Sequence, residues 1–352
     1  MMNYNIHIIT GLSGGGAEHL VLDLSQRAKE DQKKVVVISV TGLKAIEHKF
    51  TALGIPCHFL NIDSFSQLAS GLTKAKRILA EYAQKPVVHC HMFHAVLVAI
   101  LLKLSGSPIK IVFTLHNNSV SSSFRRIILF LSKPLRCKDV VFSDRGKKWY
   151  LKNSIVLPNG INLTKFKKGK EYPEKKPEVF KFLFLGSLTE QKNPLYVPEI
   201  AQKIKDRGII NFKIYFIGEG PLKSRLIEKI KQFNVQDHIE LVGFRNDVPE
   251  LLPDFHAQIM PSLWEGMPIS ILESGSVGLP VITTPVGSIP DFLTSETGYL
   301  ASIADFHLAM ISLMTNYNEA ILKAKSFKQK VRSEFDIDKI YERHQALYAS
   351  CE

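Results

Sequence analysis

The segment AQIMPSLWEGMPISILESGSVGLPVITT, residues 257–284, contains a complete strand–helix–strand unit. Its first apolar run ends at Ser262, and Pro268 suits the first position of a helix because its missing N–H would be unpaired there anyway. Gly278 is a helix stop signal, and a second apolar run, PVITT, follows it. Short apolar strands that flank a helix indicate parallel pairing in an α/β sheet.

The same alternation extends along the whole chain. Short apolar runs such as NIHIIT, VVVISV, PVVHC and IKIVFTLH alternate with helical patterns before the charged, proline-containing segment KFKKGKEYPEKKPEVFK, and the pattern restarts after it. A single core stops growing at roughly 250–300 residues, so 352 residues favour two domains. The sequence predicts an α/β protein with two Rossmann-like domains, residues 1–165 and 166–335, that face a cleft. We expect the helix in residues 336–352 to pack back toward the first domain.

Composition favours a cytoplasmic protein. The residues are 45% hydrophobic and 22% charged, and the start MMNYNIHIIT shows neither a basic leader nor a small-residue cleavage site. The longest uncharged apolar run, AVLVAILL, is far shorter than the ~20 residues that cross a bilayer. Cys57, Cys90, Cys137 and Cys351 have no paired spacing, which suits a reducing compartment better than a disulfide framework.

The positive charge of the chain is concentrated in its first half. Residues 1–165 hold 22 Lys and Arg against nine Asp and Glu, whereas residues 166–352 are nearly neutral. Such a charge favours an anionic partner: a phospholipid surface, a lipid phosphate or nucleic acid. The densest segment, SSSFRRIILFLSKPLRCK, predicts a basic amphipathic helix that contacts an anionic membrane. The alternative is an ordinary surface helix with its apolar face in the core.

Three features of the first domain suggest a site. Residues 14–16 are a glycine turn before a helix, which lets a phosphate approach the backbone, although the pattern is not GxGxxG and a turn without a ligand is the alternative. His89 and His91 share one strand face while Cys90 points to the other, and no nearby residue completes a metal-ligand set, so we expect no metal. His116 follows a strand and so can face the cleft; a structural histidine is the alternative.

In the second domain, charged residues follow two strands. Lys192 lies in GSLTEQKNP, where it can meet a diphosphate as a mobile point charge. Glu265 lies in the loop before the helix of the opening segment, and Glu273 projects from its second turn, where a carboxylate can accept hydrogen bonds from vicinal hydroxyls. The alternatives are a solvated lysine and two surface glutamates.

These motifs together resemble a known enzyme family. The relevant segments are PSLWEGMPISILESGSVGLPVITTPVGSIPDFL, GSLTEQKNP, FIGEGPLKSRL, LVGFRNDVPELL, VLPNGIN and ITGLSGGGAEH. They are similar to the retaining nucleotide-sugar glycosyltransferases of family 4, which have the GT-B architecture. The resemblance covers nearly the whole chain, is strong over residues 181–293 and is looser in the first domain.

The resemblance implies roles in the second domain. Glu273 matches the glutamate that holds the ribose hydroxyls, and Glu265 matches the one that faces the donor sugar. Lys192 matches the lysine that neutralises the diphosphate. The loop whose backbone touches the sugar and the β-phosphate corresponds to Gly266, Met267 and Pro268.

The resemblance also implies roles for residues outside that loop. His116 resembles the first-domain histidine near the transferred sugar, and Gly15 and Gly16 lie in the turn that approaches the phosphates. Arg245 falls in the segment beside the base. Where the family usually has a second cation for the diphosphate, this chain has Ser187, and Arg245 is a candidate replacement.

The activity implied is transfer of a sugar from a nucleotide diphosphate donor, a UDP-sugar, to an acceptor hydroxyl with retained configuration. The implied acceptor is a lipid-linked or surface saccharide, such as a capsule or lipopolysaccharide intermediate, made at the inner face of a bacterial membrane. We expect no cofactor and no divalent metal, because helix N-capping explains the Asp-x-Asp at residues 336–338.

Two alternatives remain. An enzyme of the same fold, such as a nucleotide-sugar epimerase or a glycan phosphorylase, also needs paired sheets and a phosphate site. A non-catalytic binder of nucleic acid or another anionic polymer would use the basic first half, but the glutamate pair would repel its phosphates. We therefore expect no nucleic-acid partner.

Overall fold

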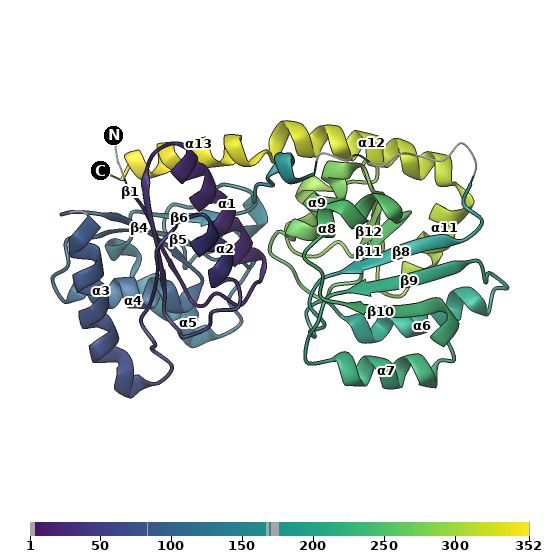
Figure 1. Ribbon diagram of the computed structural model, residues 1–352, viewed down its shortest axis with the longest axis horizontal. Coiled ribbons are helices and arrows are strands. Elements are labelled where there is room, and N and C mark those ends of the chain that lie inside the picture. Colours follow the sequence, from purple (N-terminus) through teal and green to yellow (C-terminus); the bar gives the residue numbers. More distant parts are fainter. Residues whose placement is uncertain (1–3, 83, 167–168, 170–175, 352) are drawn as a thin grey trace. The chain divides into compact units, whose positions relative to one another are not determined.

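The computed structural model describes residues 4–82, 84–166, 169 and 176–351, and it divides the chain into two compact units (Figure 1). One unit comprises Met1–Gly160 and Ile337–Glu352, and the other comprises Ile161–Asp336. The boundaries therefore fall after residues 160 and 336. Much of the charged segment that predicts a boundary, residues 167–168 and 170–175, lies outside the described residues.

The first unit has a seven-stranded parallel sheet with the strand order β3-β2-β1-β4-β5-β6-β7. Its strands are β1 (Tyr4–Ile9), β2 (Lys34–Ser39), β3 (Cys57–Phe59), β4 (Val87–His91), β5 (Lys110–Thr114), β6 (Lys138–Val141) and β7 (Ile155–Val156). The helices are α1 (Gly16–Glu30), α2 (Glu47–Ala52), α3 (Leu68–Tyr82), α4 (Phe93–Leu104), α5 (Ser123–Leu131) and α13 (Ile337–Ala349). Valine and isoleucine dominate the strands because both faces of a parallel sheet are covered.

The second unit has a six-stranded parallel sheet with the order β10-β9-β8-β11-β12-β13. Its strands are β8 (Phe180–Leu185), β9 (Phe212–Ile217), β10 (Ile239–Gly243), β11 (Ala257–Met260), β12 (Val281–Thr283) and β13 (Tyr299–Leu300). The helices are α6 (Val197–Lys205), α7 (Lys223–Gln232), α8 (Val248–Leu251), α9 (Ile269–Val277), α10 (Ile289–Phe292), α11 (Phe306–Thr315) and α12 (Tyr317–Glu334). The prediction of two Rossmann-like α/β domains is confirmed.

The segment that opened the sequence analysis folds as β11, α9 and β12. Pro268 lies one residue before α9, at the capping position, rather than at the first helical residue. Gly278 ends the helix with φ of +88°, and its N–H donates to the carbonyls of Ser274 and Gly275 at 3.1 and 3.0 Å. This left-handed conformation favours glycine, so Gly278 is the stop that the sequence predicts.

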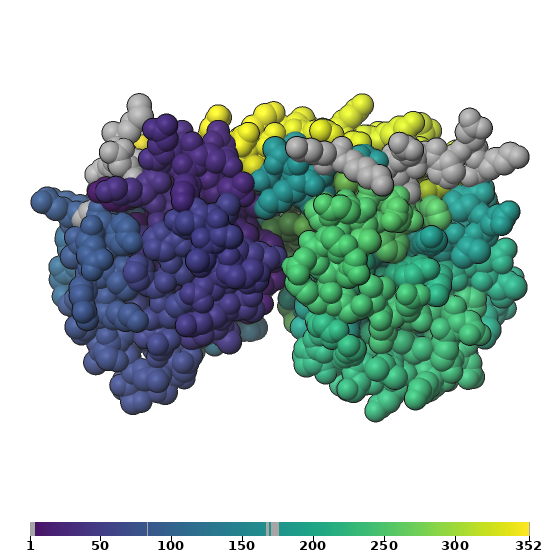
Figure 2. Space-filling model, in the orientation of Figure 1, coloured from purple at the N-terminus to yellow at the C-terminus, as the bar shows by residue number. Residues whose placement is uncertain are grey.

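The C-terminal helix α13 belongs to the first unit and packs against α1 (Figures 1 and 2, yellow beside purple). Arg27 donates to Asp338 at 2.7 Å, and the Tyr341 hydroxyl donates to Asp31 at 2.9 Å. Asp338 lies in the first turn of α13, and its carboxylate makes this cross-helix ion pair. None of the helices within the described residues has the length and hydropathy needed to cross a bilayer.

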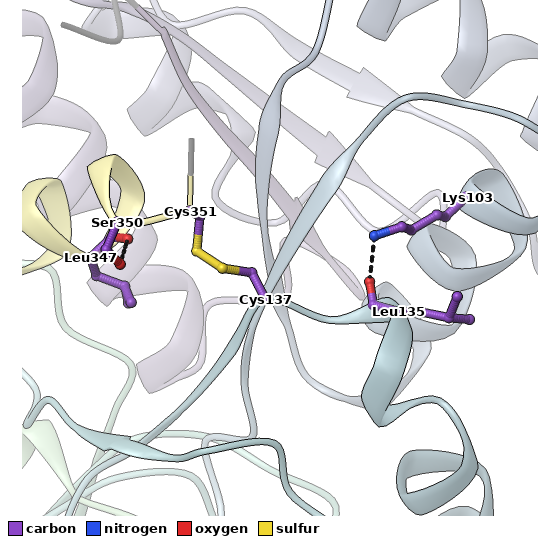
Figure 3. Close-up of a disulfide and its surroundings, with 6 residues drawn as sticks. All are labelled: Lys103, Leu135, Cys137, Leu347, Ser350 and Cys351. Carbon is purple, nitrogen blue, oxygen red and sulfur yellow. Dashed lines mark hydrogen bonds between the residues drawn. A yellow bond between two sulfur atoms is a disulfide. The ribbon is translucent and has the colours of Figure 1, made fainter.

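A disulfide joins Cys137 to Cys351, with Cα atoms 6.0 Å apart (Figure 3). The expectation of four unpaired cysteines is therefore wrong for these two, while Cys57 and Cys90 are free. The sequence separation of 214 between the partners hides their proximity. Because α13 packs on the first unit, its end reaches the start of β6, and Cys351 is buried there.

Candidate active site

Lys192 and Glu265 form a buried ion pair in the second unit. The Lys192 Nζ lies 2.7 Å from Glu265 Oε1, and their side chains are only 15% and 4% exposed. The second carboxylate oxygen, Oε2, accepts from Gln191 Nε2 at 3.1 Å. The loops that carry these residues follow β8 and β11, which are neighbours in the sheet. Two loops at the carboxyl ends of adjacent strands thus bring a cation and an anion together.

The ammonium group of Lys192 keeps capacity for a further acceptor. It has three N–H donors, and its partners among the described residues are the Glu265 carboxylate and the sulfur of Met260, a weak acceptor at 3.8 Å. A phosphate oxygen that entered beside Nζ would be a stronger acceptor than the thioether. The pair therefore presents a charged donor and a carboxylate at one point of the site.

Two glycines fix the backbone around this pair. Gly218 has φ of +146°, and a Cβ there would lie 2.0 Å from the carbonyl oxygen of Gly186. Gly287 has φ of +64°, and a Cβ there would lie 2.2 Å from the carbonyl oxygen of Glu265. Any other residue would push the loops apart.

The loop between β11 and α9 is held from behind by Ser288. Both its backbone N–H, at 3.1 Å, and its hydroxyl donate to the carbonyl oxygen of Gly266. Met267 is buried, and Pro268 caps α9 with an extended backbone. Glu273 is half-buried on α9, in the same strand–helix connection as Glu265. Of these two glutamates, Glu265 is the one that forms the ion pair with Lys192.

Neither Ser187 nor Arg245, the two residues that the sequence analysis considered at this point, adds a second cation to the ion pair of Lys192 and Glu265. Ser187 is exposed, and its hydroxyl lies 3.4 Å from that of Thr189. Arg245 binds Asp247 through two contacts, one of 2.8 Å between Nε and Oδ1. This exposed pair commits the guanidinium group to Asp247.

The glycine turn of the first unit carries a carboxylate that the sequence analysis missed. Gly15 caps α1 and Gly16 is its first residue. Glu18 is buried; its Oε1 accepts from the Ser13 hydroxyl at 2.7 Å, and its Oε2 is 2.9 Å from where a Gly15 Cβ would lie. A carboxylate in the first turn complements the helix dipole but repels an incoming phosphate. The signal in the sequence was the acidic residue two positions after the glycines.

His116 follows β5 and adopts a left-handed backbone conformation with φ of +63°. Its Nε2 lies 2.9 Å from Nδ1 of His91. Burial lowers the pKa of His116 to about 3, and His344 contributes in the same direction. The imidazole is therefore neutral at physiological pH, so it acts through hydrogen bonds rather than charge.

Family models match both halves of the chain. Residues 165–333 match the model described as glycosyl transferases group 1, and residues 14–165 match the one described as Glycosyltransferase Family 4. The two matches meet at residue 165, close to the boundary between the two units.

Curated relatives cover most of the chain at modest identity. UDP-Gal:alpha-D-GlcNAc-diphosphoundecaprenol alpha-1,3-galactosyltransferase of Escherichia coli is 27% identical over 86% of this chain and 84% of its own. The putative glycosyltransferase EpsF of Bacillus subtilis is 27% identical over 79% of this chain and 78% of its own.

Solved structures share the fold. HepE of Anabaena in complex with UDP and glucose superposes with a TM-score of 0.82, at 17% identity, over 98% of this chain and 99% of that one. The lipopolysaccharide outer core galactosyltransferase WaaB gives a TM-score of 0.74 at 18% identity, over 98% and 99% of the two chains.

Proposed function

We propose that this chain, whose two halves match models described as glycosyl transferases group 1 and Glycosyltransferase Family 4, is a retaining enzyme of the GT-B architecture that uses a UDP-sugar. The acceptor is a hydroxyl group of a lipid-linked or surface saccharide. The observation that carries the proposal is the buried pair of Lys192 and Glu265 at adjacent strand ends. The names of its relatives support the substrates, since the Escherichia coli enzyme is named for UDP-Gal and a diphosphoundecaprenol acceptor.

Each charge of the pair has a task during transfer. Negative charge grows on the diphosphate as it leaves, and Lys192 stabilises this charge because its ammonium is already held in place. Glu265 orients the lysine and accepts from a hydroxyl of the donor sugar. Glu273 accepts from the ribose hydroxyls further along α9, and the loop backbone at residues 266–268 lies against the phosphate.

The first unit supplies the neutral His116, which donates to or accepts from the transferred sugar. The turn at Gly15 and Gly16 offers its backbone N–H groups to the phosphates, against the repulsion of the Glu18 carboxylate. Retention of configuration follows if the leaving phosphate oxygen takes the acceptor proton on the face where the new bond forms. Because a lysine carries the leaving-group charge, transfer needs no divalent metal at the diphosphate. Chelation of Mg²⁺ and Mn²⁺ in the assay should leave the rate unchanged.

Thermal stabilisation by UDP-, GDP- and ADP-sugars tests the donor assignment. We expect UDP-sugars to raise the melting temperature, and we expect Lys192→Met and Glu273→Gln to remove most of the shift. Lys213→Met is a matched control, because Lys213 pairs with Glu240 at the same distance of 2.7 Å on the surface of the same unit. A full shift in the Lys192 and Glu273 variants would exclude the proposed roles, and isomerised donor in the product would identify an epimerase.

We also propose that the protein works at the inner face of the cell membrane, which it contacts through α5. Of the α5 residues only Leu129 is buried, so the helix does not direct its apolar face into the core. Five large apolar residues on this helix or after it are exposed: Phe124, Ile127, Phe130, Leu131 and Trp149. The ring of Trp149 lies 5.3 Å from that of Phe130, and Lys133 lies 4.8 Å above the Phe130 ring. Exposed aromatic side chains beside cations suit an anionic lipid surface.

Vesicle sedimentation tests this contact. We expect binding to vesicles that contain phosphatidylglycerol, weaker binding at high salt, and no binding to neutral phosphatidylcholine vesicles. Replacing both Phe124 and Trp149 by serine should abolish the binding. Ile210→Ser is the control, because Ile210 is an exposed apolar residue of the second unit. Equal sedimentation of the double variant and the wild type would overturn the assignment.

A further inference from the structure

Three buried histidines from two adjacent strands gather on one face of the first sheet. His7 lies on β1 opposite His89 on β4, and His91 is two residues further along β4 on the same face. Their side chains are at most 1% exposed, and one ring nitrogen from each lies within 4.8 Å of the others. The sequence analysis did not include His7, which is distant in the sequence but adjacent to His89 in the sheet.

The hydrogen bonds of these histidines leave one buried nitrogen without a partner. His7 Nδ1 lies 3.0 Å from His91 Nε2, and His91 Nδ1 lies 2.9 Å from His116 Nε2. A neutral imidazole has one N–H and one lone pair, so the protons of this row point either toward His7 or away from it. In both cases the Nε2 of His7, at the end of the row, has no partner among the described residues. A buried polar atom of this kind indicates a missing partner.

Two histidines of the cluster form hydrogen bonds of the kind that metal-ligating histidines form through the ring nitrogen that does not bind the metal. Such residues hold their second ring nitrogen in a hydrogen bond, which fixes the orientation of the ring. His89 has Tyr348 Oη 2.7 Å from Nδ1 and Thr114 Oγ1 2.7 Å from Nε2, and His91 has His116 beside Nδ1. His89 and His91 therefore each keep an outer partner if their other nitrogen binds an ion.

We propose that His7, His89 and His91 bind one divalent transition-metal ion of the zinc class. Neutral imidazoles suit Zn²⁺, Co²⁺, Ni²⁺ and Cu²⁺, whereas Mg²⁺ and Ca²⁺ require oxygen ligands. Zinc–nitrogen bonds of about 2.0–2.1 Å place tetrahedral ligand atoms about 3.4 Å apart, so the ring nitrogens draw closer when the ion enters.

The proposed ligands belong to the first unit, whereas Lys192 and Glu265 belong to the second. His116, which has a role in the proposed transfer, contacts the ligand His91. The ion links β1 to β4 at the centre of the first sheet, so its role is structural. Because the ligands are buried, it enters as the unit folds rather than afterwards.

Metal analysis of the purified, unmodified protein is the first test. We expect about one equivalent of zinc per chain after dialysis, and X-ray absorption should show three imidazole nitrogen ligands. The chain unfolded with chelator and refolded with Co²⁺ should develop the visible absorption bands of a tetrahedral Co²⁺ centre. Folded protein that holds no metal and gives no such bands would overturn the proposal, and the cluster would then be a network of hydrogen bonds alone.

Two variants locate the site. His7→Phe keeps a ring on β1 without nitrogen ligands and should lower the zinc content at least tenfold. His238→Phe is the buried control, because His238 is a buried histidine of the second unit, stacked on Phe212. If His7→Phe does not fold, the metal content and Co²⁺ spectrum of the wild type still decide. Zinc retained in folded His7→Phe would overturn the assignment.

Discussion

Lys192→Met isolates the energetic contribution of the buried pair. Methionine keeps much of the length of lysine but leaves the Glu265 carboxylate, 4% exposed, with the neutral amide of Gln191 as its donor. Removing one partner of a buried ion pair destabilises a protein by about 3–5 kcal/mol. Since the Lys192 side chain is 15% exposed, we expect the lower limit, about 3 kcal/mol. For a unit the size of residues 161–336 this lowers the melting temperature by about 6–12 °C.

The double variant Lys192→Met/Glu265→Gln should recover most of that loss. Without the carboxylate no buried charge is left unpaired, and the amide still bonds to Gln191. We expect the double variant to lie within about 1 kcal/mol of the wild type, which gives a coupling energy of at least about 2 kcal/mol. Neither variant should gain a UDP-dependent rise in melting temperature, because the diphosphate has lost its cation.

The chain allows each unit to be followed separately. It has two tryptophans, Trp149 in the first unit and Trp264 in the second, so a Trp149→Phe background reports the unfolding of the second unit alone. Guanidinium denaturation followed by Trp264 fluorescence then gives the free energies of unfolding. The exposed pair of Lys213 and Glu240 is the control, for which Lys213→Met should change stability by less than about 1 kcal/mol. Equal effects of Lys192→Met and Lys213→Met would refute the reasoning.

Three further predictions concern other contacts. Gly287→Ala should weaken UDP binding, measured by calorimetry, at least tenfold, because its Cβ would meet the Glu265 carbonyl at 2.2 Å; unchanged affinity would show that the loop yields. Cys351→Ser should lower the stability of the first unit by about 4–5 kcal/mol in oxidising buffer and by nothing in reductant, because the disulfide spans 214 residues; the fluorescence of Trp149 measures this, and equal losses in both buffers would contradict it. Arg136→Met should destabilise the same unit by about 3–5 kcal/mol because it leaves the fully buried Asp139 without its guanidinium, and a partner change of Asp139→Asn should restore stability in the same assay.

The alternation of strands and helices could be predicted from the sequence, because buried parallel strands are continuous apolar runs. Strands β3 and β13 were missed because His58 interrupts the apolar residues of the first, and Gly298 and Ser302 bound a very short apolar run at the second. The start of α9 was displaced by one residue, because proline is compatible with both the capping position and the first helical position. Local pattern thus predicts elements well and their ends less well.

The site was predictable to the extent that strand ends carry it. The positions of Lys192 and Glu265 after strands were apparent, but their mutual ion pair depends on β8 and β11 being neighbours, which spacing does not reveal. His7 and the bond from Cys137 to Cys351 were missed for the same reason. Contacts between residues far apart along the chain depend on topology, which a periodic pattern does not encode.

The return of α13 to the first unit has a consequence for biosynthesis. The second unit consists of one continuous segment, so a nascent chain can complete it once residue 336 has left the ribosome. The first unit begins earlier but lacks α13 until residue 349 has left the ribosome. The surface of this unit that α13 covers is therefore exposed until then. The first unit is thus the part of the nascent protein most in need of a chaperone.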